Sequence, residues 1–133
     1  MKRTILVSAA FFAWSGVAAA QDWSCSNTEF EISCADGACD AAESFTPMSV
    51  SVGRENIQIC AYTACMSGEV TSYSQAGDLV LFATDKLVHE NPLYSVDGVG
   101  NAAIVIDETT GGALIHSVFQ TPMMCTRIEP VDD

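Results

Sequence analysis

Six cysteines carry the clearest chemistry in this sequence. They are Cys25, Cys34, Cys39, Cys60, Cys65 and Cys125. An even number of cysteines in a short exported chain is typical of a disulfide framework. Zinc binding is the alternative, but the sequence has no Cys-x-x-Cys pair, and His89 and His116 lie in no ligand-like cluster. The cysteines therefore predict three disulfides, no free thiol, no metal and no cofactor.

The first repeated cysteine interval suggests a local pair. Cys34-x4-Cys39 encloses Asp36-Gly37, and this dipeptide favours a two-residue hairpin turn because both of its positions require a positive φ. In such a hairpin Cys34 and Cys39 face each other at a non-hydrogen-bonded pair, within reach of a disulfide. The spacing therefore predicts a Cys34–Cys39 bridge.

The second interval, Cys60-x4-Cys65, has the same length but contains no such turn dipeptide. Its pairing is predicted from the spacing alone, and it requires a bend near residues 62–63 because an extended strand would hold the two thiols apart. Elimination then pairs Cys25 with Cys125. That bridge would join the two ends of the domain.

Two histidines are the candidates for acid–base chemistry. His116 precedes Ser117, but adjacent strand residues point to opposite faces, so we expect one side chain outward and the other inward. His89 is followed by Glu90 and Asn91, where a solvated loop is expected. No Gly-x-Ser-x-Gly motif is present. The sequence therefore assigns no catalytic residue.

Oxygen-bearing side chains, most of them acidic, gather in two regions that could hold a hard cation. These are Asp36 and Asp40 around Gly37, and Asp97, Asn101, Asp107 and Glu108 further along the chain. The Asp-x-Asp-x-Asp-Gly spacing of a calcium loop is absent from both regions. Ordinary turn chemistry is therefore the expected role of these carboxylates.

Several aromatic residues are candidates for a binding face: Trp23, Tyr62, Tyr73, Phe82 and Tyr94. Among them Tyr94 is the predicted contact residue, because it lies in a glycine-containing loop between residues 91 and 101. Tyr62 stands beside the cysteines and is expected in the core. Met123 and Met124 are expected to pack around the disulfide of Cys125.

The amino terminus has the three-part layout of a secretory signal peptide. Lys2 and Arg3 precede an uncharged apolar run over residues 4–17, and three alanines at 18–20 provide the small side chains of a cleavage site. A membrane anchor is the alternative, but a spanning helix needs about 20 apolar residues and this run is shorter. We therefore expect a signal peptide over 1–20, one mature domain over 21–133, a periplasmic or secreted location, and no stable membrane insertion after cleavage.

The mature chain would be strongly acidic. Without Lys2 and Arg3, three basic residues remain against seventeen acidic ones, a net charge of −14. Such a surface repels phosphate backbones, so nucleic-acid binding is not expected. It attracts basic partners by long-range steering, although the same charge also serves solubility alone.

Short apolar runs separated by turn residues predict an all-β domain with little helix after the signal peptide. The expected strands lie at 30–34, 48–52, 57–64, 79–82, 103–107 and 113–119, and the ordered part is expected to end at Cys125, after Pro122. This pattern fits a small antiparallel β-sandwich or barrel and leaves the choice between them open.

The combination of export signal, compact β-domain, disulfides and acidic surface is similar to that of periplasmic inhibitors of lysozyme. Their Ser-Gly-x-x-Tyr loop does not occur in this sequence, so the resemblance assigns no inhibitory residue. We expect a non-enzymatic module that binds a protein, in particular a basic one, or a cell-envelope component. The alternatives are a small periplasmic hydrolase whose site forms only in three dimensions, and a purely structural envelope protein.

Overall fold

A computed structural model describes residues 22–27, 30–91, 100–117 and 120–129 of the chain. The predicted signal peptide and Tyr94 lie outside the described residues. Eleven β-strands make up the regular structure of the described part: β1 (Asp22–Ser26), β2 (Glu31–Ala35), β3 (Ala38–Ala42), β4 (Met48–Val52), β5 (Asn56–Ala61), β6 (Ala64–Glu69), β7 (Ser72–Ala76), β8 (Leu79–His89), β9 (Gly100–Asp107), β10 (Gly112–His116) and β11 (Gln120–Ile128). No helix in these ranges is long and apolar enough to cross a membrane.

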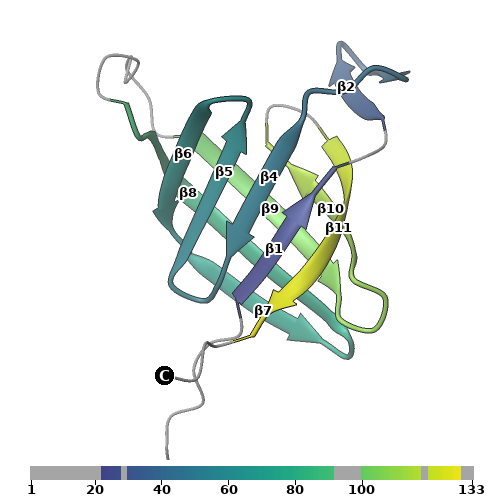
Figure 1. Ribbon diagram of the computed structural model, residues 1–133. Helices are drawn as coiled ribbons and strands as arrows, with labels where there is room; N and C mark the ends of the chain where they lie inside the picture. The colour runs from purple at the N-terminus through teal and green to yellow at the C-terminus, as the bar shows by residue number, and fades with distance from the viewer. Residues whose placement is uncertain (1–21, 28–29, 92–99, 118–119, 130–133) are drawn as a thin grey trace, which may run out of the picture.

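Eight of the strands form a closed antiparallel barrel (Figure 1). Their order is β1-β4-β5-β6-β8-β9-β10-β11, and β11 pairs back onto β1 to close the ring. The β2–β3 hairpin projects from one end of the barrel and joins it through a single register pair, Gln120 with Ile32. Strand β7 pairs with β8 near the opposite end. The all-β prediction is confirmed, and the open choice resolves to a barrel.

Strict alternation of side chains fills the inside of this barrel. In β4, Met48, Val50 and Val52 are buried, whereas the two intervening serines are exposed. Strands β1, β5, β8, β9, β10 and β11 also contribute buried side chains to this core, whereas β6 contributes the partly buried Met66. The largest fully buried apolar side chains are Phe82, Ile57, Leu87, Ile104, Ile106, Ile115, Val50, Val52 and Val80.

The Cys25–Cys125 disulfide lies within this core and crosses the seam where the barrel closes. The two cysteines face each other in the β1–β11 register, with a Cα–Cα distance of 4.0 Å and relative exposures of 2% and 5%. A bridge between residues 100 positions apart therefore fixes the contact between the first and last strands of the ring.

The other two predicted disulfides are also present, each across a tight hairpin, and all six cysteines are paired. Asp36 and Gly37 have φ values of 53° and 80°, as the hairpin turn requires. Cys60 and Cys65 bracket a turn at 62–63, where Tyr62 has a φ of 54°. The bend that the Cys60–Cys65 bridge requires is therefore a complete reversal of the chain.

Three sequence-based expectations fail at this level. The single strand expected over 57–64 is two strands, because the chain reverses between Ala61 and Ala64. Tyr62 was expected in the core, but at the apex of that turn it is 75% exposed. The ordered part does not end at Cys125, since β11 continues to Ile128 as the partner of β1.

Pro122 lies inside β11 and does not interrupt it. On the edge of β11 away from β10, the pairing with β2 is at Gln120 and the pairing with β1 begins at Met124. Pro122 falls between these two pairings, where no ladder partner requires its missing N–H group. Met123 is buried as expected, whereas Met124 is 56% exposed on the outer face.

The three disulfides should differ in their contribution to stability. In the chain-entropy model, a bridge that closes about 100 residues stabilises by ~4.7 kcal/mol, and one that closes about 5 residues by ~2 kcal/mol. We expect Cys25→Ala/Cys125→Ala to lower the free energy of unfolding by about 4–5 kcal/mol. Cys34→Ala/Cys39→Ala should cost about 2 kcal/mol or less. Urea unfolding of both variants tests this, and equal losses would contradict it.

Alanine substitutions at Gly111 and Gly77 form a second matched comparison of stability, because the two glycines share a backbone conformation and differ in their surroundings. Both have a positive φ, 76° and 60°, but only at Gly111 would a Cβ atom overlap a backbone atom, the carbonyl oxygen of Cys125. We expect Gly77→Ala to cost about 1 kcal/mol, which is the strain of the left-handed conformation. Gly111→Ala should cost about 3 kcal/mol or more, because overlap adds to that strain. Thermal unfolding measures both, and similar midpoints would show that the close approach is unimportant.

Candidate functional site

One depression on the described surface is a groove of about 700 Å³ along the outer wall of β4, β5, β6 and the end of β8. We call it the acidic groove. Its floor contains hydroxyl and amide side chains, namely Ser51, Asn56, Gln58 and Ser67, and three carboxylates lie along it, namely Asp22, Glu55 and Glu69.

Strand register builds the floor of the acidic groove. Ser51 pairs with Gln58, Gln58 pairs with Ser67, and Ser67 pairs with Val88, so one row of neighbouring positions crosses four strands. These positions alternate with core residues and therefore face outward. The row presents uncharged hydrogen-bonding groups to solvent, with a half-exposed valine at its end.

The carboxylates of the groove come from three separate elements: the start of β1, the β4–β5 turn and the end of β6. Glu69 forms an ion pair with Lys86 at 3.5 Å, in which both side chains are more than half exposed. An exposed pair of this kind contributes about 0–1 kcal/mol, so a competing cation displaces it at little cost. Arg54 lies in the groove too, but its guanidinium is held 4.3 Å from the ring centroid of Tyr73.

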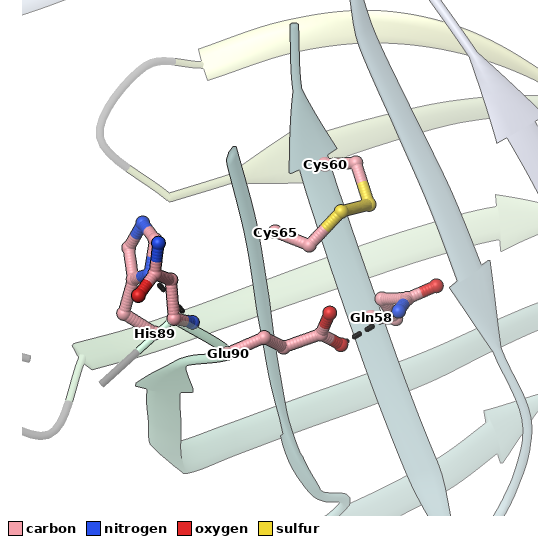
Figure 2. Close-up of a disulfide and its surroundings, with 6 residues drawn as sticks. Gln58, Cys60, Cys65, His89 and Glu90 are labelled. Carbon is pink, nitrogen blue, oxygen red and sulfur yellow. Dashed lines mark hydrogen bonds between the residues drawn. A yellow bond between two sulfur atoms is a disulfide. The ribbon is translucent and has the colours of Figure 1, made fainter. Parts of the chain in front are cut away.

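A fourth carboxylate lies on the same wall. Glu90 accepts a hydrogen bond of 2.6 Å from the Gln58 amide beside the Cys60–Cys65 bridge, as Figure 2 shows. Glu90 also lines a second depression, of about 680 Å³, together with His89 and Asn91. Gln58 lines the acidic groove and bonds to Glu90, which lines the second depression, so these two side chains connect the two depressions.

His89 and Glu90 are adjacent, but they do not form an acid–base pair with each other. Figure 2 shows the Glu90 carboxylate directed to Gln58 and the imidazole lying well away from it. The Nδ1 atom of His89 accepts a hydrogen bond of 3.1 Å from the backbone N–H of Asn91. An acceptor at Nδ1 leaves the proton of the neutral ring on Nε2, so that atom is a donor and not a general base.

His89 also lines a small cavity of about 160 Å³ together with Ser117. The positions of these two residues in the sequence did not predict that they lie in the same cavity. The remaining lining is largely apolar and includes Met48, Ile59 and Met66. The tautomer imposed on the imidazole makes this histidine unsuited to activate the Ser117 hydroxyl.

His116 and Ser117 point to opposite faces, as expected. Ser117 lines the cavity, whereas His116 is exposed on the outer wall, where its Nδ1 lies 2.7 Å from the Nε2 of Gln120. The two residues therefore do not act on one reacting atom.

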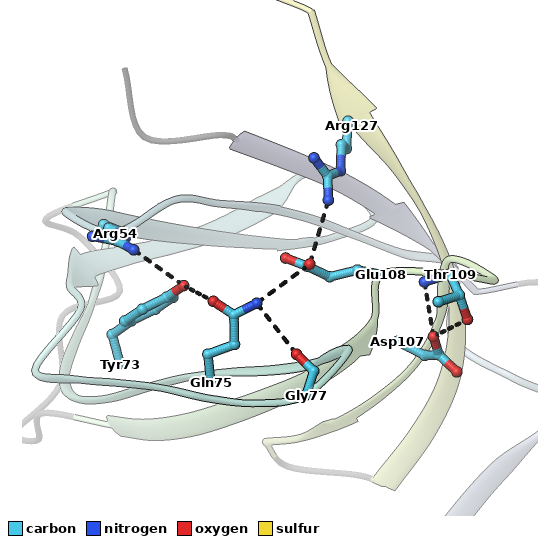
Figure 3. A network of polar contacts seen from close by, with 8 residues as sticks. All are labelled: Arg54, Tyr73, Gln75, Gly77, Asp107, Glu108, Thr109 and Arg127. Carbon is cyan, nitrogen blue, oxygen red and sulfur yellow. Dashed lines mark hydrogen bonds and ion pairs between the residues drawn. The ribbon is translucent and has the colours of Figure 1, made fainter. Parts of the chain in front are cut away.

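A chain of polar contacts crosses the end of the barrel near β7 (Figure 3). Arg54 donates to the Tyr73 hydroxyl, Tyr73 donates to Gln75, and Gln75 donates to Glu108. Glu108 in turn pairs with Arg127 at 3.5 Å. Glu108 is therefore engaged in internal contacts, which removes it from the candidate cation ligands.

The aromatic candidates mainly serve packing. Trp23 is 4% exposed and lies under the guanidinium of Arg127, and Phe82 is 2% exposed. The Tyr73 ring packs on Phe82 with centroids 5.3 Å apart. Tyr62 alone of the four described candidates is strongly exposed, and Tyr94 remains a predicted contact outside the described residues.

Asp107 has an ordinary turn role. Its Oδ1 atom accepts hydrogen bonds from the hydroxyl and the backbone N–H of Thr109, at 2.6 and 2.8 Å (Figure 3). These bonds favour the charged form and lower the pKa of the carboxyl below its ordinary value of 3.8. Within the described ranges, no three histidine, cysteine or acidic side chains are grouped so as to hold a metal ion.

Sequence reasoning missed the acidic groove because its carboxylates are far apart along the chain. A signal was nevertheless present: alternate positions of the strands at 48–52 and 56–61 carry Ser, Asn and Gln, which marks one outward face as polar. The chain matches no protein-family model, no curated protein and no solved structure. Its three disulfides indicate an oxidising compartment.

The role of Asp107 can be tested by pH. A carboxyl with a lowered pKa in the folded chain adds stability above its unfolded pKa, near 3.8, and loses it as the pH falls through the folded value. We expect Thr109→Ala to raise the pKa of Asp107 and to destabilise the protein at pH 7, with the deficit shrinking toward pH 2. Carboxyl NMR titration and urea unfolding measure these effects.

Thr71→Ala is the matched control, because the Thr71 hydroxyl donates to the uncharged carbonyl of Ala83. Its stability deficit should stay constant over the same pH range. If the two variants respond to pH in the same way, the hydrogen bonds of Thr109 do not set the titration of Asp107.

Proposed function

We propose that this protein is an exported, non-enzymatic binding module whose acidic groove receives a cationic segment of a protein partner. The observation that carries the proposal is the gathering of Asp22, Glu55 and Glu69 along one groove over a hydroxyl and amide floor. Carboxylates accept charge-assisted hydrogen bonds from lysine and arginine, and the floor offers further acceptors along the segment.

The charge of the whole chain supports the same partner. The mature sequence predicted from cleavage after Ala20 has a net charge of −14, which raises the local concentration and the association rate of a basic partner. Polar groups from three strands also make the groove a rigid surface, because each floor residue belongs to a paired strand. A preformed surface spends less free energy on ordering when it binds.

The hydrolase alternative has less support. The described groove lining contains hydroxyls but no histidine that could activate them. The small cavity that His89 shares with Ser117 holds the imidazole in the tautomer that donates at Nε2. Neither arrangement supplies a nucleophile with its base.

The oxidising environment indicated by the disulfides agrees with export, and we propose the periplasm or the extracellular medium as the location. A basic envelope protein or a secreted basic enzyme would be met there. The resemblance in composition to inhibitors of lysozyme makes lysozyme a suitable folded basic probe.

The test is titration calorimetry of the mature protein with octalysine and with lysozyme at low salt. Asp22→Asn/Glu55→Gln/Glu69→Gln should weaken binding by about 10- to 100-fold, since each exposed ion pair contributes about 0.5–1 kcal/mol. Raising the salt concentration should weaken binding of the parent protein, because exposed charges are screened within about 10 Å at 0.1 M.

The matched control is Asp36→Asn/Asp40→Asn/Glu43→Gln, which removes the same three charges from the exposed hairpin and the residues after it. It should leave the affinity within about twofold. If both triple variants weaken binding equally, net charge and not the groove attracts the probe. If neither probe binds at low salt, the proposal is wrong.

A further inference from the structure

A small apolar cavity lies at the end of the barrel where the β5–β6 hairpin turns. It is the cavity of about 160 Å³ that His89 shares with Ser117. Met48 and Ile59 line it from the core and are 8% and 2% exposed, whereas Ala64 lines it from the surface. The cavity therefore leads from solvent into the core of the barrel.

The register of the β5–β6 hairpin explains why there is space at this end. Ile59 pairs with Met66, and two positions nearer the turn Ala61 pairs with Ala64. Both pairs lie on the same face of the hairpin, because alternate residues of a strand point to the same side. A pair of long side chains is thus followed by a pair of methyl groups, which leaves room for a guest molecule beside the long pair.

Hydrogen bonds and a disulfide hold the walls of the cavity in place. On the β4 side, the buried Asn27 side chain accepts from the backbone N–H of Met48 at 2.7 Å and donates to the carbonyl of Thr46 at 2.8 Å. On the hairpin side, the Cys60–Cys65 bridge joins β5 to β6 next to the two alanines. Walls that are tied on both sides resist collapse, so the cavity is preformed for a guest.

The lining determines the chemistry of the guest. Among the described residues that line the cavity, none is a carboxylate, a lysine or an arginine. The thioether side chains of Met48 and Met66 are flexible and polarisable, so they adapt to a ring or to a short chain. An apolar cavity of about 150 Å³ takes up benzene, which sets the size of guest that fits here.

We propose that this cavity binds a small neutral molecule with an apolar ring or chain of about six to eight non-hydrogen atoms. A charged guest would lose its hydration without gaining a charged partner in the lining. The net charge of −12 further disfavours an anion. This binding goes beyond the function proposed for the acidic groove, and none of the three groove carboxylates lines the cavity.

The test is an NMR titration of the mature protein with toluene, benzyl alcohol and benzoate, followed through the methyl signals of Met48 and Met66. We expect both neutral compounds to shift these signals with a dissociation constant on the order of 0.1–1 mM, and benzoate to bind about tenfold more weakly or worse. If toluene near its solubility limit shifts neither signal, the proposal is wrong. Benzoate that binds as tightly as benzyl alcohol overturns the assignment to neutral guests.

The variant Ala61→Leu fills the cavity and should weaken the binding of benzyl alcohol by about tenfold or more. The matched control is Ala103→Leu, which adds the same atoms at a half-buried alanine on the outer face of β9. It should leave the dissociation constant within about twofold of the parent value. Binding that is equally strong in Ala61→Leu and in the parent places the guest elsewhere and overturns the proposal.

A second variant, Met66→Ala, enlarges the cavity and gives a gain of binding that unfolding cannot imitate. Naphthalene is too large for the parent cavity, and we expect the variant to bind it about fivefold more tightly or better than the parent. Naphthalene affinity that is the same in both proteins contradicts the proposal. Circular dichroism confirms that each variant is folded. Neutralising the groove carboxylates or raising the salt concentration should leave the binding of benzyl alcohol unchanged, so the two proposals fail separately.

Discussion

The fold depends on the contact between β1 and β11, because that pairing turns an open sheet into a ring. Cys25 and Cys125 face each other in this seam and are 100 residues apart in sequence, so the loop that their contact closes costs more chain entropy than either hairpin. The disulfide removes most of that cost once it forms. With β1 held between β11 and β4, each strand of the ring has two neighbours, and among the described strands β3 and β7 retain a free edge.

Closure of the barrel also determines which side chains face the core and which lie on the outer walls. Inward positions of all eight strands converge on one apolar core, and outward positions divide into two walls of different chemistry. The wall of β4, β5 and β6 carries serine, asparagine and glutamine with carboxylates along its groove, whereas the wall of β8 to β11 carries leucine, valine and proline.

The residues that could have performed catalysis are separated by the same alternation. His116 is exposed on the outer wall, whereas Ser117, just after the end of β10, lines the small cavity. The Glu90 carboxylate is directed to Gln58 and not to the neighbouring His89. Where a histidine and a serine do share a cavity, the hydrogen bond from Asn91 fixes the imidazole as a donor. A hydrogen bond from Thr109 explains Asp107 as a turn residue, and the ion pair with Arg127 explains Glu108 as a residue that closes the end of the barrel.

The sequence by itself determined the all-β class and the two hairpin disulfides, and the third bridge, Cys25–Cys125, followed from these two by elimination. Alternation of apolar and polar residues, the Asp36-Gly37 turn and the repeated cysteine spacing are local features whose physical consequences do not depend on distant residues. Local signals failed where a distant partner decides the outcome, as at Pro122 and at the extension of β11 to Ile128. The closed barrel and the acidic groove were decided by the tertiary structure alone. Which strands become neighbours depends on long-range pairing, and only that pairing brings Asp22, Glu55 and Glu69 into one groove.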